Sequence, residues 1–396
     1  MTEAELFEQL LGIKEIRVDR VDWQEHALHI YCSSIFEEAL CPHCLKKRRI
    51  IHQSYERQIR DLAMTGKEVY LHLNQRQFYC PDCDRRFNER FNFIAPQRAM
   101  TRRYERHVYE SCKASTIQKV STQENLVWST VNDICQRGAR QELQERTLLN
   151  VKVVGMDEFA IKKGHRDYAT VIVDLERVEV IDILDYREQA KLIAYFKNKG
   201  TGWCEGIEVF CSDMWSGFMN TARAVFPRAT IIVDRFHFFS YLNKAIDNQR
   251  KRLRRQCKDH EAFKHLKWAL LKNAEDLTPE QKKKRDRAFL LSPELRLIYD
   301  HKEKFRTIFN QNLTRKQGEA ELEKWIKAAR KMNNKYLNRF LYMLNDWKEY
   351  VLNYFVYRVT TSIIEGINNT IKTVKRMGYG FRNFVNFKQR ILISFA

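Results

Sequence analysis

The spacing of hydrophobic and polar positions changes twice along the chain, and each change marks a different kind of structure. In the first hundred residues, short runs rich in alternating apolar side chains predict strands over 57–62, 68–73 and 77–79. From Thr101 the apolar spacing becomes helical, and from Val151 it becomes that of strands again. We therefore expect a β-rich first region, a helical second region and a mixed third region.

The helical region contains two short expected helices, over 116–121 and 128–135, on either side of a turn. Val131 and Ile134 give the second helix one apolar face. If this pair is a helix-turn-helix, the early residues of its second helix meet base edges in the major groove. The candidate base contacts are Trp128, Thr130 and Asn132. A plain helical linker is the alternative.

The third region predicts a mixed sheet with helices between some of its strands. The expected strands run over 151–156, 168–173, 178–184, 207–212 and 230–233, the first three antiparallel. Acidic residues follow several of these strands directly, among them Asp157, Asp174, Asp213 and Asp234. Carboxylates that converge at strand ends can bind divalent metal ions, since hard cations prefer oxygen ligands.

About 130 residues without convincing strands follow Asp234, and their spacing predicts a series of long helices. Aromatic residues recur there at helical spacing, which is typical of a core. Basic residues crowd one stretch that includes Arg250, Arg252, Arg254 and Arg255, and a second stretch over 282–287. A basic helix is commonly only a solvated face. Two such stretches in a basic chain favour contact with the DNA backbone.

Composition narrows the classes of protein that fit this pattern. The 396 residues carry 70 Lys and Arg against 50 Asp and Glu, a net charge of +20, which suggests a polyanionic partner. With 44% hydrophobic and 12% aromatic residues, the chain is not mostly disordered. No run approaches the roughly 18 apolar residues of a membrane span, and the acidic start does not resemble a secretory signal.

Four of the ten cysteines form two tight C-x2-C pairs, at Cys41/Cys44 and Cys80/Cys83. Two such pairs place four soft thiolates within reach of one tetrahedral Zn²⁺ ion. The predicted strands between them indicate a zinc ribbon with an enlarged hairpin. The six scattered cysteines are expected to be ordinary buried thiols, because nothing in the chain suggests a disulfide framework.

A third carboxylate is needed beside Asp157 and Asp213, and Glu365 is the best candidate. It opens a helical segment that places Asn368, Asn369, Lys372 and Arg376 further along the same helix. Amides and cations beside a carboxylate suit a phosphate backbone. The runner-up is Glu158, although its side chain would point to the opposite face of an extended strand.

Taken together, these motifs resemble the DDE-type transposases of bacterial insertion sequences, specifically the ISL-three family. The resemblance covers nearly the whole chain and rests on the order and spacing of its motifs. These are the two cysteine pairs, 155–159 (Gly-Met-Asp-Glu-Phe), 212–215 (Ser-Asp-Met-Trp), 234–237 (Asp-Arg-Phe-His), 365–369 (Glu-Gly-Ile-Asn-Asn) and 380–383 (Gly-Phe-Arg-Asn). The chain departs from the family pattern at Ser362, a position where Asn is frequent.

The resemblance implies a fold, a site and an activity. The fold would be α/β, an RNase H-like core interrupted by an all-α insertion and preceded by a zinc ribbon and a helix-turn-helix. The catalytic triad would be Asp157, Asp213 and Glu365, binding two Mg²⁺ (or Mn²⁺) ions. Asp234 and His237 match a D-x2-H element, expected to act beside the metal ligands or in positioning DNA, or merely to tie strand to helix. The activity would be recognition of terminal inverted repeats, strand cleavage and strand transfer.

These expectations divide the chain into five parts: a zinc-ribbon domain (1–98), a helix-turn-helix (99–148), the first part of the core (149–240), the insertion (241–357) and the last part of the core (358–396). The expected partner is double-stranded DNA, bound by a homodimer or larger assembly in the bacterial cytoplasm, at the nucleoid. Two alternatives remain: an RNase H-like nuclease without strand transfer, and an inactive DNA-binding regulator derived from a mobile element.

Overall fold

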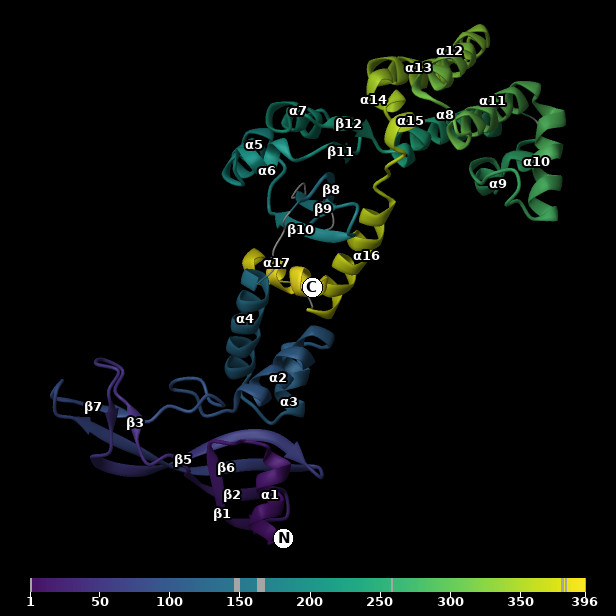
Figure 1. Cartoon of the computed structure of the whole chain (residues 1–396). Helices are drawn as coiled ribbons and strands as arrows, with labels where there is room; N and C mark the ends of the chain where they lie inside the picture. Colours follow the sequence, from purple (N-terminus) through teal and green to yellow (C-terminus); the bar gives the residue numbers. More distant parts are fainter. Residues whose placement is uncertain are drawn as a thin grey trace. The chain divides into compact units, whose positions relative to one another are not determined.

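The computed structural model describes residues 2–145, 150–161, 168–257, 259–378, 381 and 383–395. Gly380 and Arg382 of the last sequence motif lie outside these described residues. The chain divides into two compact units, residues 1–145 and 146–396, whose elements are labelled in Figure 1. None of the described helices combines the length and the apolar composition needed to cross a membrane.

The first unit is built on a sheet with the order β1-β2-β6-β5, to which β7 adds on β6. The strands are β1 (Ile16–Trp23), β2 (Ala27–Ser34), β5 (Ile51–Met64), β6 (Lys67–Cys80) and β7 (Arg85–Asn88). Helix α1 (Glu3–Leu11) begins with a capping box between Thr2 and Glu5, and its Phe7 and Leu11 join the core of the sheet. The sequence analysis expected the β5–β6 hairpin, but it did not predict β1 and β2.

Three helices complete the first unit: α2 (Arg102–Ala114), α3 (Ile117–Gln123) and α4 (Trp128–Glu145). Buried Val120 in α3 and buried Val131 and Ile134 in α4 give these helices a common apolar core. The α2 end is tied to the sheet through fully buried Asp61 of β5, which accepts a hydrogen bond from Thr101 at 2.6 Å and pairs with Arg103. The sheet and the three helices therefore belong to one unit.

The second unit contains a five-stranded sheet with the order β10-β9-β8-β11-β12. Its strands are β8 (Val153–Ala160), β9 (Tyr168–Asp174), β10 (Glu179–Leu184), β11 (Val209–Ser212) and β12 (Thr230–Val233). Strands β8, β9 and β10 are antiparallel neighbours, whereas β11 runs parallel to both β8 and β12. This is the mixed sheet expected for an RNase H-like core.

The helices that connect and complete the core are α5 (Gln189–Asn198), α6 (Thr201–Glu205), α7 (Ser216–Val225), α16 (Ser362–Met377) and α17 (Phe384–Ile393). Helix α16 packs on β8 through Ile364. Gly155 of β8 makes this approach possible, because a Cβ atom there would lie 2.9 Å from the Ile364 side chain and 2.8 Å from Leu175. The helix that carries Glu365 is therefore held close to the strand that carries Asp157.

The insertion is helical throughout its described residues, as the sequence pattern predicts. Its elements are α8 (Arg235–Gln256), the short 3-10 helix η1 (His260–Phe263), α9 (Lys267–Leu271), α10 (Pro279–Leu291), α11 (Pro293–Asn310), α12 (Arg315–Lys331), α13 (Lys335–Asp346), α14 (Lys348–Leu352) and α15 (Tyr354–Tyr357). Helix α8 starts immediately after β12, so the expected boundary at residue 240 falls inside it. Several of the recurring aromatic residues are buried in a core, including Trp325, Phe340 and Phe355, whereas Tyr342 and Tyr357 are exposed.

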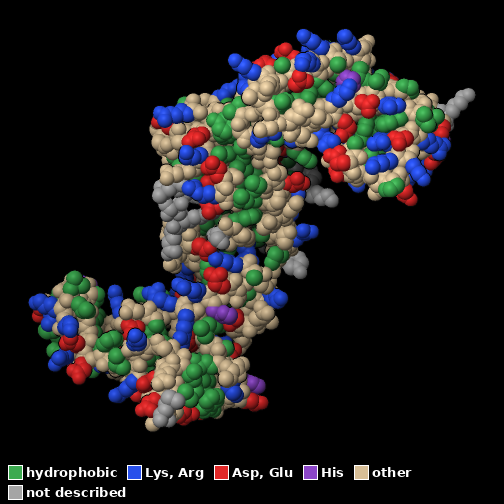
Figure 2. Space-filling model, turned by 45° about the vertical axis from the view of Figure 1, so that its right-hand side comes forward, with side chains coloured by type: hydrophobic (Ala, Val, Ile, Leu, Met, Phe, Trp, Pro, Cys, Tyr) green, Lys and Arg blue, Asp and Glu red, His purple; other side chains and the backbone are tan. Residues whose placement is uncertain are grey.

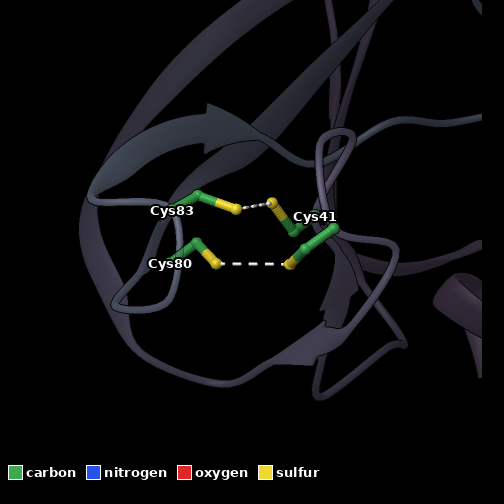
Figure 3. Close-up of side chains that lie close together, drawn as sticks. Cys41, Cys80 and Cys83 are labelled. Atoms are coloured by element: carbon green, nitrogen blue, oxygen red, sulfur yellow. Dashed lines mark hydrogen bonds between the residues drawn. The ribbon is translucent and has the colours of Figure 1, made fainter.

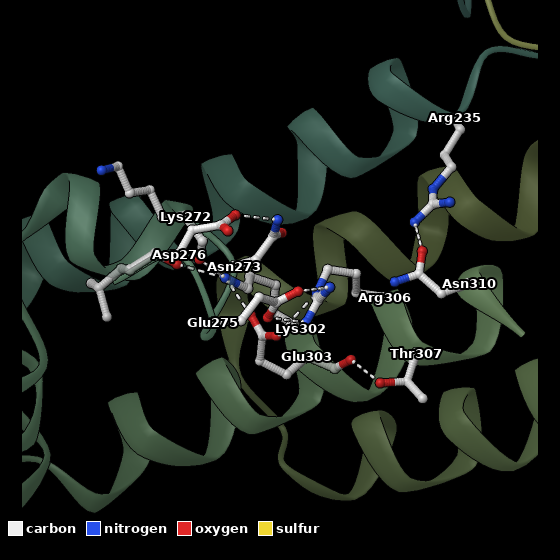
Figure 4. Close-up of polar contacts among 11 residues, drawn as sticks. Arg235, Lys272, Asn273, Glu275, Asp276, Lys302, Glu303, Arg306, Thr307 and Asn310 are labelled. Atoms are coloured by element: carbon white, nitrogen blue, oxygen red, sulfur yellow. Dashed lines mark hydrogen bonds and ion pairs between the residues drawn. The ribbon is translucent and has the colours of Figure 1, made fainter. Parts of the chain in front are cut away.

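A buried cation joins several helices of the insertion. Lys302 of α11 donates hydrogen bonds to the carbonyl oxygens of Leu270 (2.9 Å) and Lys272 (2.8 Å) and pairs with Glu303 at 2.7 Å, in the network drawn in Figure 4. Burial lowers the pKa of Lys302, although the neighbouring Glu303 opposes this effect. Because each donor is used within the protein, the network is part of the scaffold.

Candidate functional site: a thiol cluster and a carboxylate cluster

The four predicted zinc ligands come together at the end of the first unit's sheet. Within this cluster the ligand atoms of Cys41, Cys44, Cys80 and Cys83 all lie within 4.8 Å of one another. The Sγ–Sγ distances are 3.6 Å between Cys44 and Cys80 and 4.0 Å between Cys41 and Cys83, as Figure 3 shows for the latter pair. Four Zn–S bonds of about 2.3 Å in a tetrahedron require sulfur separations of about 3.8 Å. The donor set therefore fits a zinc ion.

The loops after the two cysteine pairs have the same backbone feature. Leu45 and Asp84, which directly follow Cys44 and Cys83, have positive φ angles of 57° and 49°. Arg48 of β4 (Lys47–Arg48), which pairs with β3 (Ala39–Leu40), donates hydrogen bonds to Cys80 Sγ at 3.2 Å and to Cys44 Sγ at 3.6 Å. The backbone N–H of Lys46, assisted by Arg48, lowers the pKa of Cys44 to about 6. This environment favours the thiolate, which is the form that binds metal.

The other six cysteines lie outside this cluster, and none of these described residues forms a disulfide bond. Five are buried and Cys257 is partly buried. The burial of these five agrees with the expectation of ordinary buried thiols.

The second unit brings Asp157 and Asp213 together through the register of its parallel strands. Met156 of β8 pairs with Ser212 of β11, so the next residues along the two strands are the two aspartates. Their carboxylates and a ring nitrogen of His237 lie within 4.8 Å of one another. Burial raises the pKa of Asp157 and raises that of Asp213 to about 6. Two carboxylates held this close, with little solvent, can be stabilised by a cation between them.

His237 is oriented by Asp234, which is buried at the start of α8. The ring Nδ1 of His237 lies 3.1 Å from Asp234 Oδ2, and Asp234 Oδ1 accepts a hydrogen bond of 3.1 Å from the backbone N–H of Thr361. Burial lowers the pKa of His237, but the hydrogen bond to Asp234 and the charges of the three aspartates outweigh it, so the net shift is upward. Asp234 thus connects three parts of the fold: β12, α8 and the start of α16.

Glu365 is not among the residues that the structure gathers at the two aspartates. It lies exposed in the first turn of α16, and it makes no hydrogen bond or ion pair with a described residue. Asn369, Lys372 and Arg376 are also exposed and continue from Glu365 as one stripe along the helix. The alternative acid, Glu158, pairs with Arg187 at 2.5 Å. Both assignments of the third acid therefore remain predictions.

Asn368 contacts the site directly. The sequence pattern places it near Glu365 together with Asn369, although only Asn369 was selected as an accessory residue. Its Nδ2 donates a hydrogen bond of 3.0 Å to Asp157 Oδ2. A signal for this residue was present in the sequence, because Asn368 interrupts the apolar side of α16 formed by Ile364, Ile367 and Ile371. Its neighbour Asn369, which was selected, is on the exposed side.

The residues expected to bind DNA have different environments. Trp128 is 48% exposed at the start of α4, and Thr130 and Asn132 are partly buried. In the insertion, Arg254 and Arg255 are exposed and make no hydrogen bond or ion pair with a described residue. Lys and Arg side chains are mixed with Asp and Glu and do not gather into one patch on the face drawn in Figure 2.

Two arginines of the same helix serve the insertion itself. Arg250 is buried, pairs with Asp247 at 2.8 Å and donates a hydrogen bond of 3.1 Å to the carbonyl oxygen of Phe263. Arg252 pairs with Glu294 at 2.7 Å. The expectation that Arg250 contacts DNA is corrected here, because its guanidinium is enclosed by the protein.

The sheet topology and the paired aspartates define a DDE-type transposase core, and comparison with known proteins agrees. Residues 154–391 match the ISL3 transposase family, residues 37–83 match the zinc finger of the transposases of IS204, IS1001, IS1096 and IS1165, and residues 89–139 match the helix-turn-helix domain of transposase family ISL3. The chain therefore belongs to the ISL3 family of transposases. It is an enzyme that cleaves DNA, and its helix-turn-helix is a DNA-binding domain.

Two curated relatives illustrate the similarity. The chain is 28% identical to the transposase for insertion sequence element IS1001 from Bordetella parapertussis, over 100% of this chain and 99% of that protein. It is 24% identical to the transposase for insertion sequence element IS1557 from Mycobacterium tuberculosis, over 65% of this chain and 63% of that protein. The DDE family implies a divalent metal ion, and the ribbon with its four cysteines indicates zinc.

Proposed function

We propose that Asp157, Asp213 and Glu365 form the metal-dependent site with which this transposase cuts and joins DNA. The observation that carries the proposal is the pair of aspartates on adjacent strands, held with His237 within 4.8 Å. Glu365 is supported by its place on α16, one turn before the residue that contacts Asp157. Residues three apart on a helix are neighbours on its surface.

The chemistry consists of two transfers at phosphorus. In cleavage, a water oxygen bonds to phosphorus, the bond to the 3′ oxygen breaks, and a 3′ hydroxyl is released. In strand transfer, that hydroxyl attacks a phosphodiester of the target, whose own 3′ oxygen leaves. Mg²⁺ or Mn²⁺, two ions held by the three carboxylates, would offset the charge on the attacking and leaving oxygens. Asp234 keeps the His237 ring turned toward the aspartate pair.

The test uses a duplex that carries the terminal inverted repeat of the element, with Mg²⁺. The wild-type protein should cut at the repeat and join a pre-cut end to a second duplex. Asp157→Asn and Asp213→Asn should each abolish both reactions while DNA affinity is kept. Cutting without joining would support a nuclease instead, and repeat binding without cutting would support a regulator.

We propose that the helix-turn-helix reads the inverted repeat through Trp128, Thr130 and Asn132 of α4. Losing one good base contact costs roughly 1–3 kcal/mol of discrimination. Asn132→Ala should therefore weaken binding to the repeat roughly 5- to 150-fold and leave binding to an unrelated duplex unchanged. The unrelated duplex is the internal control: equal losses on both duplexes would assign Asn132 to backbone contact or folding.

The assembly and the ribbon metal complete the proposal. One Zn²⁺ ion bound by the four cysteines would stabilise the ribbon. Because an element has two inverted ends, a homodimer or larger complex would hold both of them, at the nucleoid where the DNA substrate is found. Light scattering of the protein with one repeat duplex should give two or more chains per complex, and a single chain would contradict this part.

A further inference from the structure

Asn368 is a polar residue on an otherwise apolar side of α16. The buried residues of this helix are Ile364, Ile367, Asn368, Ile371 and Val374. The asparagine is only 8% exposed. A leucine or isoleucine would complete this apolar side without burying an amide, so the choice of asparagine calls for a polar partner.

One half of the Asn368 amide has such a partner and the other half has none. Nδ2 donates to Asp157 Oδ2 at 3.0 Å, whereas Oδ1 is buried and accepts no hydrogen bond from any residue that the structure describes. Exchanging the two amide atoms does not remove this imbalance, because an oxygen turned toward an ionised carboxylate would be repelled. The unpartnered oxygen therefore lies beside Asp157, on the same amide group that touches it.

We propose that Asn368 Oδ1 is an additional ligand of the divalent ion bound at Asp157 and Asp213. The inference rests on the proposed metal site and names a further residue of it. Amide oxygens are among the ligands that hard cations accept. In this arrangement Nδ2 fixes Asp157 in place, and Oδ1 gives the ion a neutral oxygen that adds no repulsion to the two carboxylates.

A merely structural role makes a different prediction from a ligand role. If Asn368 only holds Asp157, its donor group is what matters, and replacement by aspartate should be worse than replacement by alanine. If Asn368 supplies a ligand oxygen, aspartate keeps that oxygen and alanine removes it. The order of Asn368→Asp and Asn368→Ala in metal affinity therefore separates the two roles.

The experiment measures Mn²⁺ affinity of the full-length, zinc-loaded protein by electron paramagnetic resonance of the free ion. Asn368→Ala should lose roughly tenfold or more, in the range seen when groups supporting a metal site are removed. Asn368→Asp should bind Mn²⁺ within a few-fold of wild type, or more tightly. An affinity for Asn368→Asp at or below that of Asn368→Ala would overturn the proposal, as would an unchanged affinity for Asn368→Ala.

Three further measurements keep the result interpretable. Asn345→Ala and Asn345→Asp change the same residue type at an exposed position of α13, and both should leave Mn²⁺ affinity unchanged. Thermal melting with and without Mn²⁺ tests folding. Mn²⁺ should raise the melting temperature of Asn368→Asp more than that of wild type, since the extra charge of the variant faces Asp157. A rise no larger than that of wild type would count against a ligand role. Asp157→Asn tests the metal site separately from the role of Asn368. If Asp157→Asn leaves the Mn²⁺ affinity unchanged, the metal site itself is wrong. If Asp157→Asn lowers the affinity and Asn368→Ala does not, only the ligand role of Asn368 is rejected.

Discussion

The two clusters of potential metal ligands are built in opposite ways. The thiol cluster draws four cysteines from two loops within residues 41–83 of one unit. The carboxylate cluster draws Asp157, Asp213, His237 and Asn368 from four elements of the other unit. A cluster formed by two short motifs needs only a local hairpin, whereas the second cluster exists only once the whole core has folded.

The two clusters also differ in how their surroundings shift the pKa values of the ligands. At the thiol cluster, the backbone N–H of Lys46 and the Arg48 side chain lower the pKa of Cys44 to about 6, whereas the hydrogen bond with Cys44 raises the pKa of Cys83 to about 12. At the carboxylate cluster, burial raises the pKa of both aspartates, so the charged form is disfavoured without a cation. In both clusters a bound cation would stabilise the charged form of the ligands whose pKa is raised.

The largest effect should come from the third acid, which is the least settled part of the carboxylate cluster. Glu365→Gln should reduce strand cleavage and strand transfer by several orders of magnitude, because a neutral amide binds Mg²⁺ poorly. Affinity for the repeat duplex should stay within about twofold of wild type. The measurement is single-turnover cleavage of a labelled repeat duplex, alongside gel-shift binding.

Glu158→Gln is the matched control for Glu365, since it removes the same charge from the strand that carries Asp157. Glu158 is engaged by Arg187, so its loss should affect folding stability more than cleavage. An inactive Glu158→Gln protein beside an active Glu365→Gln protein would reverse the assignment of the third acid.

Removal of the ribbon zinc should weaken binding to the repeat and leave the cleavage chemistry unchanged. This tests whether the thiol cluster and the carboxylate cluster have separate roles. Cys80→Ser should lose the zinc, about one ion per chain in the wild type, and weaken repeat binding at least tenfold as the hairpin loosens. Metal analysis and gel shift are the measurements. Cys257→Ser, a free cysteine outside the cluster, is the control and should keep its zinc. A Cys80→Ser protein with full zinc content would disprove the four-thiolate site.

How much the sequence could predict follows from how local each feature is. The four cysteines were identified from spacing alone. Asp157 and Asp213 follow buried strands, as Asp174 and Asp234 also do, and the resemblance to the transposase family singled out the pair. The apolar spacing of α16 places Asn368 on the buried side and Asn369 on the exposed side. The contact of Asn368 with Asp157 could not be predicted, because it depends on how Ile364 packs over Gly155 of β8. Strand β1 was missed because charged residues and a bulge between Val18 and Arg20 break its alternation.

A smaller effect, on stability, should reveal the cost of burying the charge of Asp213 in the carboxylate cluster. The pKa of Asp213 is about 6 in the folded protein and about 3.8 when unfolded. Its contribution to the free energy of unfolding is therefore fully present below pH 3.8 and is lost as the pH rises toward 6. Asp213→Asn should be more stable than metal-free wild type by about 2 kcal/mol above pH 6, allowing for partial exposure, and equal to it near pH 3.

Chemical denaturation at pH 3.5, 5 and 7.5 measures this difference. Adding Mg²⁺ at pH 7.5 should stabilise the wild type and narrow its gap to Asp213→Asn, because the ion binds the charged carboxylate. Equal stabilities of the two metal-free proteins at every pH would show that the aspartate pair is well solvated, and the contrast with the thiol cluster would disappear.

The smallest effect concerns the basic helix α8, where neighbouring arginines serve different purposes. Arg254 and Arg255 are exposed and free of described partners, so changing both to Ala should weaken binding to unrelated DNA a few-fold. Each lost phosphate contact should reduce the slope of log affinity against log salt by about 0.9, so the double variant should lower it by nearly two. Arg250→Ala removes an enclosed guanidinium, and it should lower the melting temperature while leaving the salt slope unchanged. An unchanged slope in the double variant would mean that the DNA backbone binds elsewhere on this unit. The mixed surface charge does not by itself establish a DNA contact, whereas a change in the salt slope does.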